Sequence, residues 1–213
     1  MDGIITDTVR YHYQSWQQLW DEEKIPFTPD DNQDLLGLSR QDSIQLILDR
    51  YGRNVTPEHF QYLFDQKNVY FLQRIHGMSP ADLLPGVKPL LIYLKQAQLR
   101  IAVASSSRNT RFVLERLGIT AMFDAVIDSN IVAKAKPAPD LFIEAAKVLQ
   151  VPPHAAVVIE DAEAGIAAAH SAEMLVVGVG PAERVGAADL VVPSLEALSP
   201  EQLITTLTSI RHG

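Results

Sequence analysis

The chain has 213 residues, which fits one medium-sized domain or a smaller core that carries an insertion. Its formal net charge of −8 comes without a long basic run, which argues against sequence-independent binding to nucleic acid or to an anionic membrane surface. Cysteine is absent, so disulfides and thiolate chemistry are excluded, and no apolar run approaches the roughly 20 residues of a membrane span. We expect a cytoplasmic protein without a signal peptide.

Up to Pro80 the apolar residues recur at helical spacing, and no run of β-branched residues predicts a strand. Ser39 is a suitable N-cap for a helix that would stop at Gly52, and a further helix is predicted from Pro57 towards His76. The positions that define the first two helices are Val9, Tyr13, Trp16 and Trp20, and then Ile44, Ile47, Leu48 and Tyr51.

After Pro89, short apolar strands alternate with amphipathic helices, an order typical of a parallel sheet that is covered on both faces. The predicted strands are Arg100–Ala104, Ala125–Ile127, Ala156–Ile159, Leu175–Val179 and Leu190–Val192. The predicted helices between them include Asn109–Leu117, Ala138–Leu149 and Glu163–Ala172. This part of the chain therefore predicts a doubly wound α/β fold.

Polar residues follow several of these strands, at the edge where sheets of this class bind their ligands. Four sets stand out: residues 2–8, residues 105–109, Lys136-Pro137 and Glu160-Asp161. Each set alone has an ordinary structural explanation as a turn, a helix cap, a helix entry or a solvated loop.

Together the four sets predict phosphoryl transfer. Adjacent carboxylates suit a hard cation such as Mg²⁺. A serine hydroxyl and the backbone N–H groups of a strand-to-helix turn can hold phosphate oxygens. A nearby lysine would neutralise the charge of the transferring phosphoryl group.

The same residues follow the order of a known family. Residues 2–16 resemble the opening D-G-[VI]-I-T-D-T-x-x-x-H-x-x-x-W of the β-phosphoglucomutases, within the haloacid-dehalogenase superfamily. Residues 36–43, L-G-L-S-R-Q-D-S, resemble the cap loop K-G-[VI]-S-R-x-x-S of that family. Residues 67–68, 79–82, 104–109, 136–140 and 160–165 match in the same order, so the resemblance spans essentially the whole chain.

This resemblance implies a doubly wound parallel core of residues 1–8 and 83–213, with residues 9–82 inserted as a helical cap. In the core, Asp2 would be the general acid and base for the sugar hydroxyls. Its backbone carbonyl would bind Mg²⁺ together with Asp161, and Glu160 would support the metal. The transferring phosphoryl group would be held by Ser105, by the N–H of Ser106 and by Lys136.

The resemblance also implies roles for the residues that bind the rest of the substrate. Arg40 would bind the non-transferring phosphate, because a guanidinium matches phosphate oxygens. Thr8 would lie in the hinge. The remaining expected contacts are His12, Trp16, Gly37, Ser43 and Lys67 in the cap and Ser107, Arg108 and Asn109 in the core. His12 could instead be a core histidine, and we expect Trp16 to serve mainly in core packing.

Two positions depart from the family pattern. Leu36 stands where the family usually has lysine. In the superfamily signature D-x-D-G the first Asp becomes phosphorylated, and here Met1 takes the position x, so that nucleophile and the strand leading to it would precede Met1. We expect the natural protein to start upstream, and the 213-residue chain to be inactive and poorly stable.

The reaction implied is the interconversion of β-glucose 1-phosphate and glucose 6-phosphate through a bisphosphate, with cap closure excluding water. A sugar-phosphate phosphatase on the same scaffold is the second interpretation. A non-catalytic phosphosugar-binding remnant is the third. In each case we expect small sugar phosphates as ligands, Mg²⁺ as the cofactor of the enzyme, and a monomer that binds neither nucleic acid nor membranes.

Overall fold

A computed structural model describes residues 1–36, 38–132, 134, 136–197 and 199–212. The chain divides into two compact units. The first, here called the core unit, consists of Met1–Asp7 and Ser79–Gly213, and the second, the helical unit, is Thr8–Met78. The predicted domain limits at 8/9 and 82/83 stay a prediction.

The helical unit contains the helices α1 (Val9–Glu22), α2 (Pro29–Asp34), α3 (Arg40–Arg50) and α4 (Pro57–Ile75). The N-caps follow from the sequence, because Thr28, Ser39 and Thr56 each accept a backbone N–H of the first helical turn through the side chain. The helices pack their apolar faces into one cluster that includes Trp16, Leu19, Trp20, Ile44, Ile47 and Leu63. The expected core role of Trp16 agrees with this packing, since it is 4% exposed.

A buried carboxylate joins α2 to the end of α3. Asp31 accepts hydrogen bonds from the Arg50 guanidinium at 2.6 Å, from the Tyr51 hydroxyl at 2.9 Å and from the Thr28 backbone N–H at 2.7 Å. Burial alone would raise the pKa of Asp31, but these donors, with Arg50 first, lower it to about 2. The carboxylate therefore stays ionised across the ordinary pH range and holds the start of α2 to the end of α3.

We expect Asp31→Asn to lower the free energy of unfolding by on the order of 1–2 kcal/mol near neutral pH. Because the pKa of folded Asp31 lies below its unfolded value, this stabilisation is present above about pH 4 and is lost as the pH falls towards 2. Urea denaturation of both proteins should therefore give a difference that shrinks from about pH 6 to about pH 3. Asp34→Asn is the control, because Asp34 is 55% exposed and should contribute less. A difference that stays constant with pH would contradict the role of the charge.

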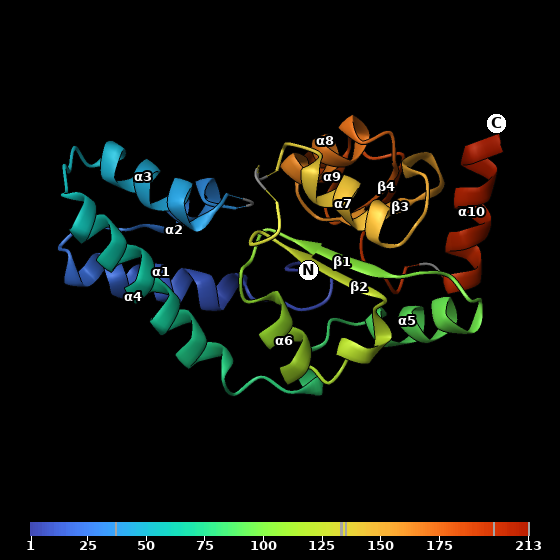
Figure 1. The fold of residues 1–213 in the computed structure, drawn as a ribbon, viewed down its shortest axis with the longest axis horizontal. Coiled ribbons are helices and arrows are strands. Elements are labelled where there is room, and N and C mark those ends of the chain that lie inside the picture. Colours follow the sequence, from blue (N-terminus) through green and yellow to red (C-terminus); the bar gives the residue numbers. More distant parts are fainter. Residues whose placement is uncertain (37, 133, 135, 198, 213) are drawn as a thin grey trace. The chain divides into compact units, whose positions relative to one another are not determined.

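In the described residues of the core unit, five short parallel strands form two sheets (Figure 1). In one sheet β1 (Ala102–Ser105) pairs with β2 (Ala125–Asp128), and in the other the order is β3 (Val157–Glu160), β4 (Leu175–Val179) and β5 (Leu190–Val192). The helices of this unit are α5 (Val87–Gln96), α6 (Thr110–Arg116), α7 (Asp140–Val148), α8 (Glu163–Ser171), α9 (Ala182–Val185) and α10 (Pro200–His212). Short 3₁₀ turns occur at Pro80–Asp82, Thr120–Met122 and Pro153–Ala155.

The predicted α/β fold with parallel strands and an N-terminal helical region is confirmed, and the strands are distributed over two sheets rather than one. The sheet registers place chemically active residues at strand ends. Ser105 stands opposite Asp128 at the end of the first sheet, and Glu160 stands opposite Gly178 in the second. Helix α7 packs on both β1 and β2 and also contacts α8, so the two sheets belong to one packed unit.

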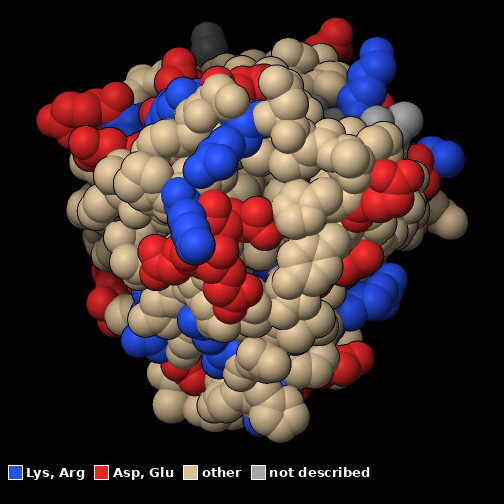
Figure 2. Space-filling model, turned by 90° about the vertical axis from the view of Figure 1, so that its left-hand side faces the viewer, with Lys and Arg blue, Asp and Glu red and all other residues tan. Residues whose placement is uncertain are grey.

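On the face drawn in Figure 2, acidic side chains gather near the centre with basic side chains beside them, and both signs occur around the rim. This pattern agrees with the charge balance of the sequence, 26 acidic against 18 basic residues. None of the described helices is both long and apolar enough to cross a membrane.

Candidate functional site

A buried ion pair lies at the carboxyl end of β3. Glu160 is the last residue of that strand, and its Oε1 accepts a hydrogen bond from Nζ of Lys136 at 2.7 Å. The two side chains are only 8% and 7% exposed. The Lys136 ammonium also lies 4.8 Å from the ring centroid of Phe142, on the first turn of α7. The structure thus brings together two predicted site residues that are 24 positions apart in sequence.

The neighbouring carboxylate of Asp161 carries an unfavourable charge. Burial raises its pKa to about 6, with a further contribution from the negative charge of Glu160. The Asp161 backbone N–H donates to the other oxygen of Glu160 at 3.1 Å. Two carboxylates in this environment favour the binding of a cation. Its positive charge would offset both the cost of burying negative charge and the repulsion between the two carboxylates.

Two glycines make room for these carboxylates. A Cβ on Gly3, which has a φ of +68°, would collide with the side chain of Asp161. A Cβ on Gly165, inside α8, would collide with the carboxylate of Glu160. Each acidic side chain therefore has room because the residue beside it is a glycine, which has no side chain. Among the described residues, no group of three or more His, Asp or Glu side chains is arranged to hold a metal ion.

The loop after β1 is held by its own serine side chains. Ser105 is 3% exposed, and its hydroxyl oxygen accepts the backbone N–H of Ser107 at 3.1 Å. The Ser107 hydroxyl oxygen in turn accepts the N–H of Asn109 at 3.2 Å, at the start of α6. The hydroxyl groups of Ser105 and Ser107 can each still donate a hydrogen bond to a ligand. Ser106 and Arg108 lie in the same loop, and their predicted contacts stay predictions.

The N-terminal segment folds into a tight turn within the core unit. The N–H of Gly3 donates to the carbonyl of Thr6 at 3.0 Å, and Asp2 and Thr6 form a β-bridge. Thr6 is fixed in turn by its hydroxyl, which donates to the carbonyl of Asp82 at 2.7 Å. Because Gly3 adjoins Asp161, the predicted metal-site residues Asp2, Glu160 and Asp161 belong to one neighbourhood.

A second set of predicted residues meets inside the helical unit. The Lys67 ammonium is 2.6 Å from Nδ1 of His12 and lies over the rings of Trp16 and Phe71, at 4.8 and 4.7 Å from their centroids. Burial lowers the pKa of His12 well below its ordinary value, and the charges of Lys67 and Arg40 lower it further. Neutral His12 therefore accepts a hydrogen bond from Lys67, and Lys67 itself is buried at 3% exposure.

The other predicted contacts in this unit are held by neighbours. Arg40 donates to the carbonyl of Phe64 at 3.0 Å and to Oδ1 of Asn68 at 2.8 Å, and it stacks over the ring of Phe64. Ser43 donates to the carbonyl of Ser39 at 2.9 Å. Thr8 is fully buried at the start of α1. Gly37 lies outside the described residues, and the substrate-binding roles of this set stay predictions.

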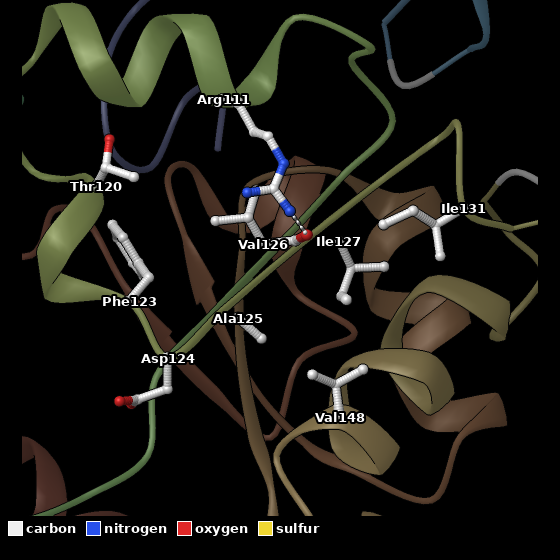
Figure 3. A pocket seen from close by; sticks show the side chains of 9 residues that line it. All are labelled: Arg111, Thr120, Phe123, Asp124, Ala125, Val126, Ile127, Ile131 and Val148. Atoms are coloured by element: carbon white, nitrogen blue, oxygen red, sulfur yellow. Dashed lines mark hydrogen bonds between the residues drawn. The ribbon is translucent and has the colours of Figure 1, made fainter.

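A cavity of about 380 Å³ lies elsewhere in the core unit, beside β2 (Figure 3). Apolar side chains form most of its wall, and the Arg111 guanidinium donates to the carbonyl of Val126 at 3.2 Å across it. None of the predicted site residues lines this cavity. Its lining residues are Arg111, Thr120, Phe123, Asp124, Ala125, Val126, Ile127, Ile131 and Val148.

With this geometry, the class of protein can be stated. Residues 1–173 match the family of haloacid dehalogenase-like hydrolases, and the chain belongs to that family. It is 43% identical over 205 residues, covering 95% of this chain and 91% of the relative, to the β-phosphoglucomutase of Bacillus subtilis. A crystal structure of β-phosphoglucomutase from Clostridium difficile superposes with a TM-score of 0.91 at 35% identity, covering 99% of this chain and 94% of that one. A phosphorylated carbohydrates phosphatase of Thermotoga maritima is 24% identical over 99% of this chain and 96% of its own length.

Proposed function

We propose that this chain has the phosphoryl-transfer site of a β-phosphoglucomutase-type isomerase, acting between β-D-glucose 1-phosphate and glucose 6-phosphate through a bisphosphate. The observation that carries the proposal is the buried ion pair of Lys136 and Glu160 at the end of β3, with the half-buried carboxylate of Asp161 beside it. It supplies an ammonium for a phosphoryl oxygen and two carboxylates for a hard cation, which are the elements of phosphoryl transfer. The similarity to β-phosphoglucomutases favours the mutase over other members of the family.

The residues present fit Mg²⁺, because two partly desolvated carboxylates adjoin one another, and burial together with the negative charge of Glu160 raises the pKa of Asp161. Asp161 would bind the ion directly, Glu160 would support it, and the backbone carbonyl of Asp2 would add an oxygen ligand. A bound Mg²⁺ would supply positive charge to the phosphate oxygens.

The remaining steps fall to side chains of this chain. Lys136 and the hydroxyl of Ser105, with the N–H of Ser106, would hold the transferring phosphoryl group. The carboxylate of Asp2 would accept a proton from the attacking sugar hydroxyl and return it to the departing one. Transfer between two positions of one sugar requires both roles from the same residue.

The helical unit is proposed to bind the other end of the substrate. Arg40 would pair with the non-transferring phosphate, with Ser107, Arg108 and Asn109 of the core unit as further donors. Neutral His12, with Nδ1 occupied by Lys67, would present the N–H of its other nitrogen to a sugar oxygen. Thr8 would take the hinge position, and the contributions of Trp16, Gly37 and Ser43 would be to shape and backbone contacts.

By the D-x-D-G pattern of the superfamily, the residue expected to be phosphorylated is an Asp directly before Met1. Turnover is therefore tested on two matched chains with the same short apolar extension, ending in Asp or in Asn directly before Met1. We expect the Asp-ended chain to convert β-glucose 1-phosphate, but not the α anomer, in the presence of Mg²⁺. The Asn-ended chain should bind the sugar phosphate without converting it, because the amide is not a nucleophile.

Three outcomes would separate this proposal from the alternatives. Equal turnover of the two anomers, or turnover that survives exhaustive chelation, would contradict it. Release of inorganic phosphate in place of glucose 6-phosphate would favour the sugar-phosphate phosphatase. Binding without turnover in the Asp-ended chain would favour the non-catalytic phosphosugar-binding protein.

A further inference from the structure

A third charged side chain at this edge of the sheet also has its charged end next to a glycine, as the two carboxylates do. Arg184 lies on α9, which directly follows β4. Its Nη2 atom is 2.8 Å from the point where a Cβ on Gly180 would stand, and Gly180 has a φ of +135°. Gly3, Gly165 and Gly180 thus make room for the charged ends of Asp161, Glu160 and Arg184 respectively.

The position of the Arg184 backbone follows from the packing of α9. Val185, the neighbour of Arg184, is fully buried against Gly178, where a Cβ would meet Val185 at 2.8 Å. Gly178 is paired with Glu160 in the sheet register. Arg184 directly precedes Val185 and therefore lies beyond the end of β4. Strand β4 is the neighbour of β3, which carries Glu160 and is followed by Asp161.

The charge of Arg184 is not neutralised by pairing. In the part of the chain that the structure describes, its guanidinium forms no ion pair with a carboxylate, and the residue is exposed. Its guanidinium lies beside Gly180, two residues beyond Gly178, which is paired with Glu160 in the sheet. Nothing in the sequence patterns assigned this arginine to the site.

We propose that the permanent positive charge of Arg184 weakens the binding of Mg²⁺ at the Glu160–Asp161 pair. The inference rests on the metal site of the proposed function. An arginine cannot lose its proton at ordinary pH, so the repulsion of a divalent cation is permanent. It keeps the ion exchangeable at a site that its two buried carboxylates would otherwise hold more tightly.

The test is a calorimetric titration of the full chain with MgCl₂. Arg184→Gln should bind Mg²⁺ about three- to tenfold more tightly than the native chain at about 0.01 M salt, and the gain should shrink at about 0.3 M salt. Arg184→Lys is the matched control and should keep the native affinity, because it keeps the charge. Asp161→Asn should lose most of the binding.

Each other outcome overturns the inference in a recognisable way. Equal Mg²⁺ binding by Arg184→Gln would overturn the role of the charge, and so would weaker binding by a variant whose thermal unfolding midpoint is unchanged. If Arg184→Lys also binds Mg²⁺ more tightly than the native chain, the shape of the arginine side chain and not its charge lowers the Mg²⁺ affinity. If neither the native chain nor any variant binds Mg²⁺, the metal site of the proposed function fails and this role fails with it.

Discussion

Replacing Lys136 by methionine is expected to lower the free energy of unfolding by about 3–5 kcal/mol. Its ammonium is the hydrogen-bonding partner of Glu160 inside the core unit, and both side chains are under a tenth exposed. Without Lys136 the carboxylate of Glu160 stays buried without its compensating charge. Urea denaturation followed by circular dichroism measures the effect, with an unchanged denaturant slope showing that the native fold is kept.

The matched control is Lys147→Met, which removes a lysine from an exposed ion pair with Glu144 on α7. Lys147 is 73% exposed, so its pair should contribute no more than about 0.5 kcal/mol. The double variant Lys136→Met with Glu160→Gln should recover part of the loss, because it removes the unpaired charge. Equal destabilisation by Lys136→Met and Lys147→Met would refute the buried pair as a stabilising element.

Gly165→Ala is expected to destabilise the chain by about 1–3 kcal/mol, although alanine favours a helix over glycine by about 1 kcal/mol. Gly165 lies within α8 with no positive φ, so the backbone itself accepts alanine. The added methyl group, however, would occupy the space of the Glu160 carboxylate and separate it from Lys136. A variant that is stabilised by propensity and still loses stability identifies the side-chain collision as the cause.

Gly77→Ala is the control for this substitution, because no atom lies within 4 Å of a Cβ at Gly77 and its φ is not positive. Its effect should stay within about 0.5 kcal/mol. The same two proteins are compared by thermal unfolding and by Mg²⁺ titration. Loss of stability with native Mg²⁺ affinity in Gly165→Ala would show that Glu160 moves without disturbing the proposed metal site.

The strands of the core unit were largely predictable from the sequence. Leu175–Val179 and Leu190–Val192 have the predicted limits. Strand β2 ends one residue later than predicted, β3 is shifted by one residue at both ends, and β1 starts two residues and ends one residue later. Buried parallel strands consist of near-continuous apolar residues, which is a strong local signal. Helix α2 was not predicted, because five of its six residues are polar and it has no apolar periodicity. Thr28 and Asp31 form a capping box that could have indicated its start.

The site was predictable in part. The order of strands placed Ser105 and Glu160 at carboxyl ends, and the structure adds that Lys136 reaches Glu160. The contact of His12 with Lys67 joins residues 55 positions apart, and no local pattern predicts such a pair. Arg184 was missed because α9 has only four residues and shows no periodicity. The sequence signal that could have found it is the Gly180-Pro181 pair, which predicts a turn directly after the strand Leu175–Val179.

The enclosure of Lys67 has a consequence for its chemistry as a primary amine. Its nitrogen lies against two aromatic faces and the imidazole of His12. An acylating reagent must reach that nitrogen with its lone pair free, which requires α1 and α4 to separate. The rate at which Lys67 is acylated therefore reports how often the helical unit opens, while lysines on the surface, such as Lys147, report only the reagent.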